Sequence, residues 1–200
     1  LMYFYPMYIT DELIQTLAAS KKIVPYLDMP LQHINDTMLR RMARRVNRAE
    51  TESLLQRLRA GIPGLTLRTT FITGFPGETD EQFAELAEFV EAQRFDRVGV
   101  FTYSHEPDTP AAQLPNAVDQ ETMEARRERL MEIQQRISFE KNQAMIGRQV
   151  EVMIDQPIPD EENVWLGRTR GDAPDIDGSV FVTGDQFPLR VGAIVPCEVV

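Results

Sequence analysis

A glycine-rich turn follows a segment with the apolar pattern of a buried strand. Residues 65–73 run into Gly74, Pro76 and Gly77, and Thr79 stands at the start of an amphipathic stretch. Ligands of parallel α/β barrels bind at the carboxyl ends of strands, where glycines let the backbone approach and N–H groups of the next helix can donate. The alternative is a plain strand-to-helix connection, which needs the same residues and which the turn taken alone favours.

Three more side chains have the chemistry to bind a small polar ligand. Gln32 follows a second strand-like segment, and its neutral amide can hydrogen-bond a ribose hydroxyl. His33 can serve the same site, although a histidine held by structural hydrogen bonds is the more common case. Arg68 precedes the glycine turn within the same strand. Its guanidinium can pair with a ligand carboxylate or form a structural ion pair.

A cluster of arginines follows the Gln32 segment. The spacings of one and four residues would give one broad face on a continuous helix, and the cluster consists of Arg40, Arg41, Arg44, Arg45 and Arg48. Such a face can contact an acidic loop, an RNA phosphate or a partner domain. A solvated face paired with local acidic side chains is the alternative that we favour.

The chain lacks the residues of several common catalytic and metal centres. It has no Walker loop, no HExxH motif and no nucleophile elbow, and one cysteine with two histidines cannot build a zinc or iron–sulfur site. We expect Cys197 to be a small buried hydrophobe. The single cysteine excludes an internal disulfide. The sequence has no run of ~20 apolar residues that could form a membrane helix, and it shows no secretory leader pattern. We therefore expect a cytoplasmic protein.

Strand and helix patterns alternate over residues 1–147, which predicts an α/β domain with a parallel sheet. The expected strands are residues 1–5, 24–31, 65–73 and 97–103. Helices are expected after caps at Thr10, Asn35, Thr79 and Asp119, and a further helix over about 49–60. The helix after Asn35 has apolar residues at helical spacing as far as Val46, and the helix after Asp119 is expected to run to about Ile146. Four strands are too few to close a barrel, and the first residues already read as a strand, so we expect part of a longer barrel.

Residues 148–200 show short apolar runs separated by turn clusters. The runs are 150–154, 164–166, 179–183 and 193–199, and the turn clusters are 155–163, 171–178 and 184–188. This predicts a small antiparallel β-barrel of the OB type. With four arginines, no lysine and ten acidic residues, the segment holds −6 of the net charge of −10. An acidic module repels phosphate backbones and suits a basic partner, although solubility alone explains the charge equally well.

Three ordered motifs resemble those of the radical S-adenosylmethionine (SAM) methylthiotransferases. Pro30–Ile34 followed by Leu39–Arg45 is similar to the central motif of that family, and Thr70–Thr79 to its fifth barrel strand and glycine turn. Phe101–Ser104 with Asp108–Ala112 is similar to the sixth strand. Residues from about 148 resemble the OB-like TRAM domain of the family. The resemblance covers essentially the whole chain and implies the C-terminal part of a radical SAM (β/α) partial TIM barrel over residues 1–147 and a TRAM domain over 148–200.

Within the family, the sequence is more similar to the enzymes that modify an aspartate of ribosomal small-subunit protein twelve than to those that modify tRNA adenosine. Gln32 continues into His33 and Ile34, where the tRNA enzymes usually have Ser-Gly-Ser. Arg97–Tyr103 and Asp172–Gly178 also resemble the first subtype. The resemblance therefore implies a basic ribosomal protein as partner of the acidic TRAM domain, without a nucleic acid or a membrane. A tRNA enzyme and a non-catalytic protein-binding module stay open as alternatives.

The resemblance implies a reaction that needs more than this chain. In the family, SAM on one 4Fe–4S cluster yields a radical that takes hydrogen from the aspartate β-carbon, and a second 4Fe–4S cluster serves delivery of the methylthio group. No cluster cysteine has a counterpart here, so we expect a missing N-terminal half to supply them and this chain alone to be inactive. The implied SAM-binding residues are Gln32 at the ribose, Arg68 at the carboxylate, Ile72 with Gly74 at the adenine, and Phe101 completing that wall.

Overall fold

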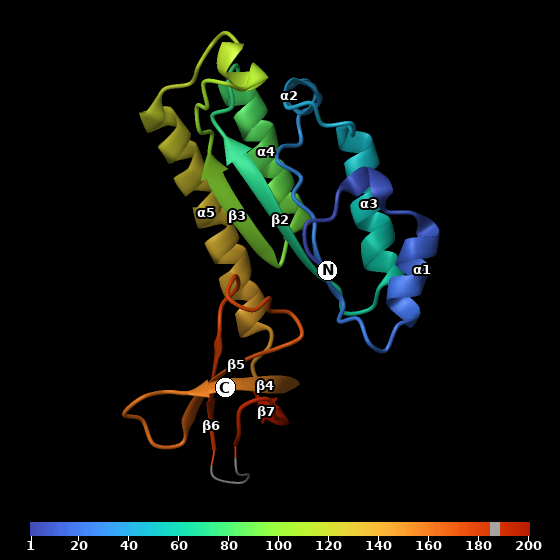
Figure 1. The fold of residues 1–200 in the computed structure, drawn as a ribbon, viewed down its shortest axis with the longest axis vertical. Helices are drawn as coiled ribbons and strands as arrows, with labels where there is room; N and C mark the ends of the chain where they lie inside the picture. Colours follow the sequence, from blue (N-terminus) through green and yellow to red (C-terminus); the bar gives the residue numbers. More distant parts are fainter. Residues whose placement is uncertain (185–188) are drawn as a thin grey trace.

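The computed structural model describes residues 1–184 and 189–200, and it places an α/β domain beside a small antiparallel β module (Figure 1). None of the helices in these ranges is long and apolar enough to cross a membrane. The helices are α1 (Asp11–Ala19), α2 (Asp36–Arg41), α3 (Arg48–Gly61), α4 (Asp80–Gln93) and α5 (Gln120–Gln143), with 3-10 turns η1 (Pro6–Tyr8) and η2 (Pro110–Gln113). The strands are β1 (Tyr26–Asp28), β2 (Thr66–Thr73), β3 (Arg97–Thr102), β4 (Gln149–Pro157), β5 (Val164–Arg168), β6 (Val180–Thr183) and β7 (Ile194–Glu198).

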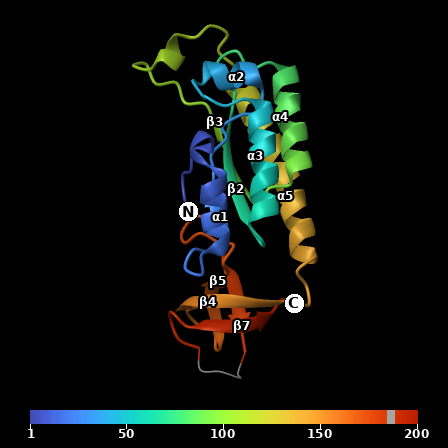
Figure 2. The same ribbon diagram turned by 90° about the vertical axis from the view of Figure 1, so that its right-hand side faces the viewer.

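The strands of the α/β domain pair in the parallel order β1-β2-β3, as the alternation of strands and helices predicts. Every second residue of β2 is buried, and among these Phe71 packs edge-on against Phe89 of α4 and against Phe95. Figure 2 shows α4 and α5 together on one side of β2. The other side of β2, which carries Arg68 and Ile72, is only half-buried. We call this side the open face.

Helices of this domain begin at the caps that the sequence predicts. Thr79 Oγ1 accepts the N–H of Gln82, and the Gln82 side chain accepts the N–H of Thr79, which completes a capping box. The side chains of Thr10, Asn35 and Asp119 also accept first-turn N–H groups of α1, α2 and α5, without the reciprocal bond of a capping box. A cap satisfies N–H groups of its own first turn. These helix starts therefore depend on local chemistry, which a sequence pattern can reveal.

The first five residues do not form the predicted strand, so the sheet has three strands instead of four. Leu1 N and Phe4 N donate to the carbonyls of Tyr26 and Asp28, both at 2.9 Å. Tyr3 between them has a φ of 58°, which interrupts the extended conformation that a strand requires. The neighbouring strand is also shorter than the predicted 24–31, because the prolines at 25 and 30 have no N–H to donate.

The predicted helix over 36–46 ends at Arg41, and the arginine cluster therefore does not share one helix face. The chain turns at Ala43, which has a φ of 55°. Arg41 and Arg44 donate to backbone carbonyls of neighbouring loops. Arg48 pairs with glutamates of α3 and α4. Most of the cluster serves to hold loops and helices together, which is closer to the alternative of local pairing than to a free basic face.

The β module is an antiparallel sheet with the strand order β6-β5-β4-β7, so the predicted change to a small all-β module is confirmed. Val152, Ile154 and Val182 form its core. A register shift between Ile154 and Gln156 bends β4 and helps the sheet to curl. Among the described residues, β6 and β7 each pair with one strand only. The turn predicted at 184–188 lies outside the described residues except for Gly184.

Candidate functional site

A pocket of about 400 Å³ lies at the carboxyl ends of the parallel strands, where the sequence predicts ligand binding. Ile72 near the end of β2 and Phe75 in the glycine turn give it apolar walls. Gln32, which follows β1, gives it a polar one. The remaining lining comes from residues 41–44 after α2 and residues 109–111 at η2. The fold therefore brings two of the predicted SAM-binding residues, Gln32 and Ile72, into one cavity.

Gln32 combines a strained backbone with an unpaired polar atom. Its φ of 71° is uncommon for a residue that has a Cβ. The β2 backbone holds it on both sides, since Gln32 N donates to Thr70 O (2.8 Å) and Ile72 N donates to Gln32 O (2.9 Å). Its side-chain Oε1 is buried and has no hydrogen-bond partner within the described part of the chain. Such an oxygen is ready to accept a hydrogen bond from a ligand.

Gly74 and Gly77 are required by the shape of the turn. Both have positive φ, of 72° and 84°. A Cβ on Gly74 would lie 1.9 Å from Cγ of Met123 on α5, and one on Gly77 would lie 2.7 Å from the Arg41 guanidinium. Arg41 Nε in turn donates to the carbonyl of Pro76 at 3.0 Å. The turn is therefore fixed between α5 and the end of α2.

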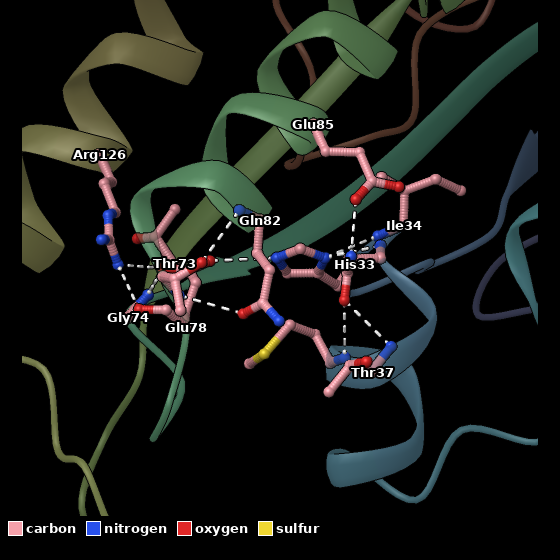
Figure 3. Close-up of polar contacts among 12 residues, drawn as sticks. His33, Ile34, Thr37, Thr73, Gly74, Glu78, Gln82, Glu85 and Arg126 are labelled. Atoms are coloured by element: carbon pink, nitrogen blue, oxygen red, sulfur yellow. Dashed lines mark hydrogen bonds and ion pairs between the residues drawn. The ribbon is translucent and has the colours of Figure 1, made fainter.

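The buried carboxylate of Glu78 joins this turn to the loop that carries Gln32 (Figure 3). Glu78 Oε1 lies 3.1 Å from His33 Nε2, and Oε2 accepts from Gly74 N and from Arg126 Nη1, both at 2.7 Å. The Glu78 and His33 side chains have no exposed surface, and that of Arg126 is 8% exposed. A buried charge is tolerated when it is paired and hydrogen-bonded, as this carboxylate is on both oxygens.

The hydrogen bonds of His33 define where its proton lies. Nδ1 accepts the backbone N–H groups of Ile34 (2.9 Å) and Asn35 (3.0 Å), so it carries no hydrogen. The hydrogen of the neutral ring must then be on Nε2, which donates to Glu78. Within this network His33 has the structural role that we weighed against ligand binding. It also fixes the segment next to Gln32.

The sequence patterns missed Glu78 and Arg126 as members of the site. Glu78 lies inside the glycine-turn motif, and its position just before the Thr79 cap is a signal for a carboxylate near the positive end of a helix. No local signal exists for Arg126, which is separated from Glu78 by 48 residues of chain and reaches it from α5.

Phe101 lies on the open face of the sheet, next to the pocket and not in its lining. It is the register partner of Ile72, and 61% of its surface is exposed. Gly74 is likewise absent from the lining and acts on the pocket through the shape of its turn. The roles of both residues at an adenine ring stay predictions.

Arg68 lies toward the opposite end of β2, away from the pocket. Its Nη1 donates to Asp28 Oδ1 at 2.8 Å, and its Nε lies 3.6 Å from Oδ1 of Asp177 in the β module. The structure thus shows the ion pair that we considered as the alternative to ligand binding. The assignment of Arg68 to a SAM carboxylate stays a prediction, which the position of this side chain does not favour.

The residues of this chain do not fit an iron–sulfur cluster. Such clusters are held by cysteine thiolates, and the only cysteine, Cys197, lies half-buried in β7. Burial raises the pKa of its thiol, which opposes the thiolate form that a metal ligand needs. Within residues 1–184 and 189–200, no group of three or more His, Cys, Asp or Glu side chains is placed to hold a metal ion.

Comparisons with known proteins agree with this geometry. The radical SAM superfamily model matches residues 3–90, and the TRAM domain model matches residues 146–200. The chain is 50% identical to the ribosomal protein uS12 methylthiotransferase RimO of Syntrophotalea carbinolica, 44% to that of Desulforamulus reducens and 46% to that of Myxococcus xanthus. Each alignment covers 100% of this chain but 43%, 45% and 41% of the relative. The chain therefore spans less than half the length of these relatives.

A solved structure supports the fold. The coproporphyrinogen III oxidase HemN of Escherichia coli, which is described as a radical SAM enzyme, matches 80% of this chain and 35% of its own length. The TM-score is 0.52 at 23% sequence identity, so this likeness concerns the fold alone. The radical SAM match contains the pocket strands β1 and β2, and the TRAM match contains the β module. Over its whole length the chain is therefore similar to the RimO relatives, with a segment that matches the radical SAM superfamily followed by one that matches the TRAM domain.

Proposed function

We propose that this chain provides the SAM pocket and the partner-binding TRAM domain of an enzyme that methylthiolates the β-carbon of an aspartate in ribosomal protein uS12. The similar proteins carry uS12 methylthiotransferase in their names. They are more than twice as long as the aligned segment, so the activity belongs to more than these 200 residues. Because the chain lacks the cysteines for two 4Fe–4S clusters, it is inactive alone.

The unpaired Oε1 of Gln32 is the observation that carries this proposal. It lines a pocket next to the apolar side chains of Ile72 and Phe75. The adenosyl group of SAM has matching parts, since a ribose hydroxyl can donate to the amide oxygen and the adenine ring can pack against the apolar walls. The pocket therefore fits the adenosyl end of SAM.

In the complete enzyme, SAM and the iron–sulfur clusters would supply the radical and sulfur chemistry, and ligands outside this chain would hold the clusters. The residues of this chain bind and orient. Gln32 Oε1 accepts a hydrogen bond from the ribose hydroxyl. Glu78 holds the Gln32 loop and the Gly74 turn in fixed positions relative to each other. The open face of β2 and β3, with the exposed ring of Phe101, leaves room for a substrate segment next to the pocket.

Ligand binding by the 200-residue chain tests the pocket. We expect S-adenosylhomocysteine, which shares the adenosyl group, to bind saturably in isothermal titration calorimetry. Gln32→Ala should weaken this binding by roughly fivefold to thirtyfold, because it removes one hydrogen bond worth about 1–2 kcal/mol. Gln15→Ala, which changes an exposed glutamine of α1, is the control. Equal affinity of Gln32→Ala and the wild type, or no binding by the wild type, contradicts the proposal.

The charge of the TRAM domain supports a basic protein partner over RNA. Residues 148–200 carry a net charge of −6. The β4–β5 connection adds a local concentration of negative charge, since Asp160, Glu161 and Glu162 follow one another and are exposed. Such a surface repels phosphates and attracts a lysine-rich protein.

A direct comparison of partners separates the alternatives. At ~0.15 M salt, we expect the chain to bind purified uS12 at least about tenfold more tightly than tRNA, a gap of about 1.4 kcal/mol. Replacing Asp160, Glu161 and Glu162 by their amides should weaken uS12 binding, while Gln15→Ala should leave it unchanged. Tighter binding of tRNA would favour the tRNA-modifying alternative. If neither partner binds, the partner role of the TRAM domain is rejected.

A further inference from the structure

A loop of the TRAM domain, residues 169–178, lies against the amino ends of all three parallel strands. It connects β5 to β6, and both ribbon views show the β module next to this end of the sheet (Figures 1 and 2). Two side chains of the loop, Asp172 and Asp177, reach Tyr26 of β1, Arg68 of β2 and Arg97 of β3. The pocket lies at the opposite ends of the strands, so this contact is separate from it.

Asp177 contacts both its own loop and the sheet. Oδ2 accepts the N–H of Ala173 at 2.8 Å and the hydroxyl of Tyr26 at 2.6 Å. Oδ1 lies 3.6 Å from Nε of Arg68. The Asp177 side chain is 4% exposed, so water contributes little to these contacts. Burial and the bond to Asp177 both raise the pKa of the Tyr26 phenol.

Asp172 also joins the loop to the sheet, with one oxygen for each. Its Oδ2 accepts the N–H (3.0 Å) and the hydroxyl (2.6 Å) of Thr169, which shapes the loop. Its Oδ1 accepts from Arg97 Nη2 at 2.5 Å, which reaches the sheet. Gly171 allows the close approach, because a Cβ at that position would lie 2.9 Å from Oγ1 of Thr66 at the start of β2.

We propose that residues 169–178 form an interdomain latch, in which Asp172 and Asp177 are positioning residues that hold the TRAM domain and the parallel sheet as one rigid body. Arg68 is part of the latch, since it lies between Asp28 of the sheet and Asp177 of the TRAM domain. The latch therefore also fixes a cationic side chain on the open face. It does not depend on the proposed function, because it needs no ligand.

Replacing either aspartate by asparagine removes at least one of its contacts. All the contacts that reach the carboxylate oxygens of Asp172 and Asp177 come from donors: N–H groups, hydroxyls or guanidinium groups. An asparagine has one acceptor oxygen and one NH₂ group, so either orientation sets a donor against a donor. At Asp172 the substitution therefore breaks the loop-side or the sheet-side contact, and at Asp177 it removes at least the ion pair with Arg68, while the size of the side chain is kept.

Backbone ¹⁵N relaxation of the chain without ligand tests the latch. In the wild type, we expect amides of both domains to report one rotational correlation time. In the double variant Asp172→Asn/Asp177→Asn, amides of residues 148–200 should report a shorter time than those of the sheet domain. Glu161→Gln, which removes an exposed carboxylate of the same domain, should tumble like the wild type. A double variant that still tumbles as one body overturns the proposal.

A second variant keeps the test valid if the loop variant does not fold. Tyr26→Phe/Arg97→Gln removes both sheet-side hydrogen bonds, leaves only the 3.6 Å ion pair of Arg68 with Asp177 on that side, and keeps the bonds inside the loop intact. It should also separate the two correlation times. If this variant keeps a single correlation time, or if the wild type already shows two, the latch does not exist. Because no ligand is present, either outcome is independent of the SAM pocket.

Discussion

Gln32 precedes His33 in the chain, and Glu78 is a hydrogen-bond partner of the His33 ring. The two buried side chains differ in whether the protein satisfies their oxygens. Glu78 has protein partners on both oxygens, so its role is to hold backbone segments in place. Gln32 has a buried oxygen without a protein partner, so it is the group that a ligand can satisfy. The sequence motif predicted Gln32 as a site residue. The role of Glu78 could not be predicted, because it depends on contacts with His33 and Arg126, which are distant in sequence.

Glu78→Gln tests the structural role of this carboxylate. Both oxygens face donors, so the glutamine NH₂ must oppose a donor, and Arg126 loses its buried counter-charge. We expect a loss of about 3–5 kcal/mol in the free energy of unfolding, measured by urea denaturation. Glu88→Gln, at an exposed position of α4, should change stability by less than about 0.5 kcal/mol. A loss below about 1 kcal/mol for Glu78→Gln would show that the network contributes little.

At the scale of elements, the sequence predicted the helix starts that depend on capping side chains, but it did not predict the points where the backbone adopts a left-handed conformation. The starts of α1, α2, α4 and α5 follow from capping side chains, and β2 and β3 follow from their apolar patterns. Two of the differences, the missing first strand and the early end of α2, occur at residues with positive φ, Tyr3 and Ala43, whose types give no warning of a left-handed conformation. Ala43 ends a stretch that has helical periodicity, because tertiary contacts override local preference there.

At the scale of the whole molecule, the sequence predicted a change of fold class but not how the two parts meet. The acidity of residues 148–200 suggested a basic partner or solubility. The structure adds a third use, because Asp172 and Asp177 face arginines of the chain's own sheet. Contacts between parts that are distant in sequence leave no periodic signal, so the pairing could not be read from either part alone.

The phenol of Tyr26 gives the interface a pH dependence. Its pKa is raised in the folded state, so above about pH 10, the ordinary tyrosine pKa, the unfolded chain releases this proton before the folded chain does. The contribution of Tyr26 to stability is full below that pH and declines as the pH rises further. The stability difference between the wild type and Tyr26→Phe should therefore shrink as the pH rises above about 10 in urea titrations. Tyr3→Phe, at an exposed tyrosine, should show no such trend.

The hydrogen bond between Tyr26 and Asp177 joins residues that are 151 positions apart. A chain made from its amino end emerges with β1, β2 and β3 before residue 177 is available, so a parallel sheet that forms at that stage has this end uncovered. Contacts of such long sequence separation are slow to form because the loop-closure entropy comes before the stabilising contact. The docking of the last fifty or so residues is therefore a late step of folding, and a nascent chain stalled before residue 177 would expose the arginines of β2 and β3 to other acidic surfaces.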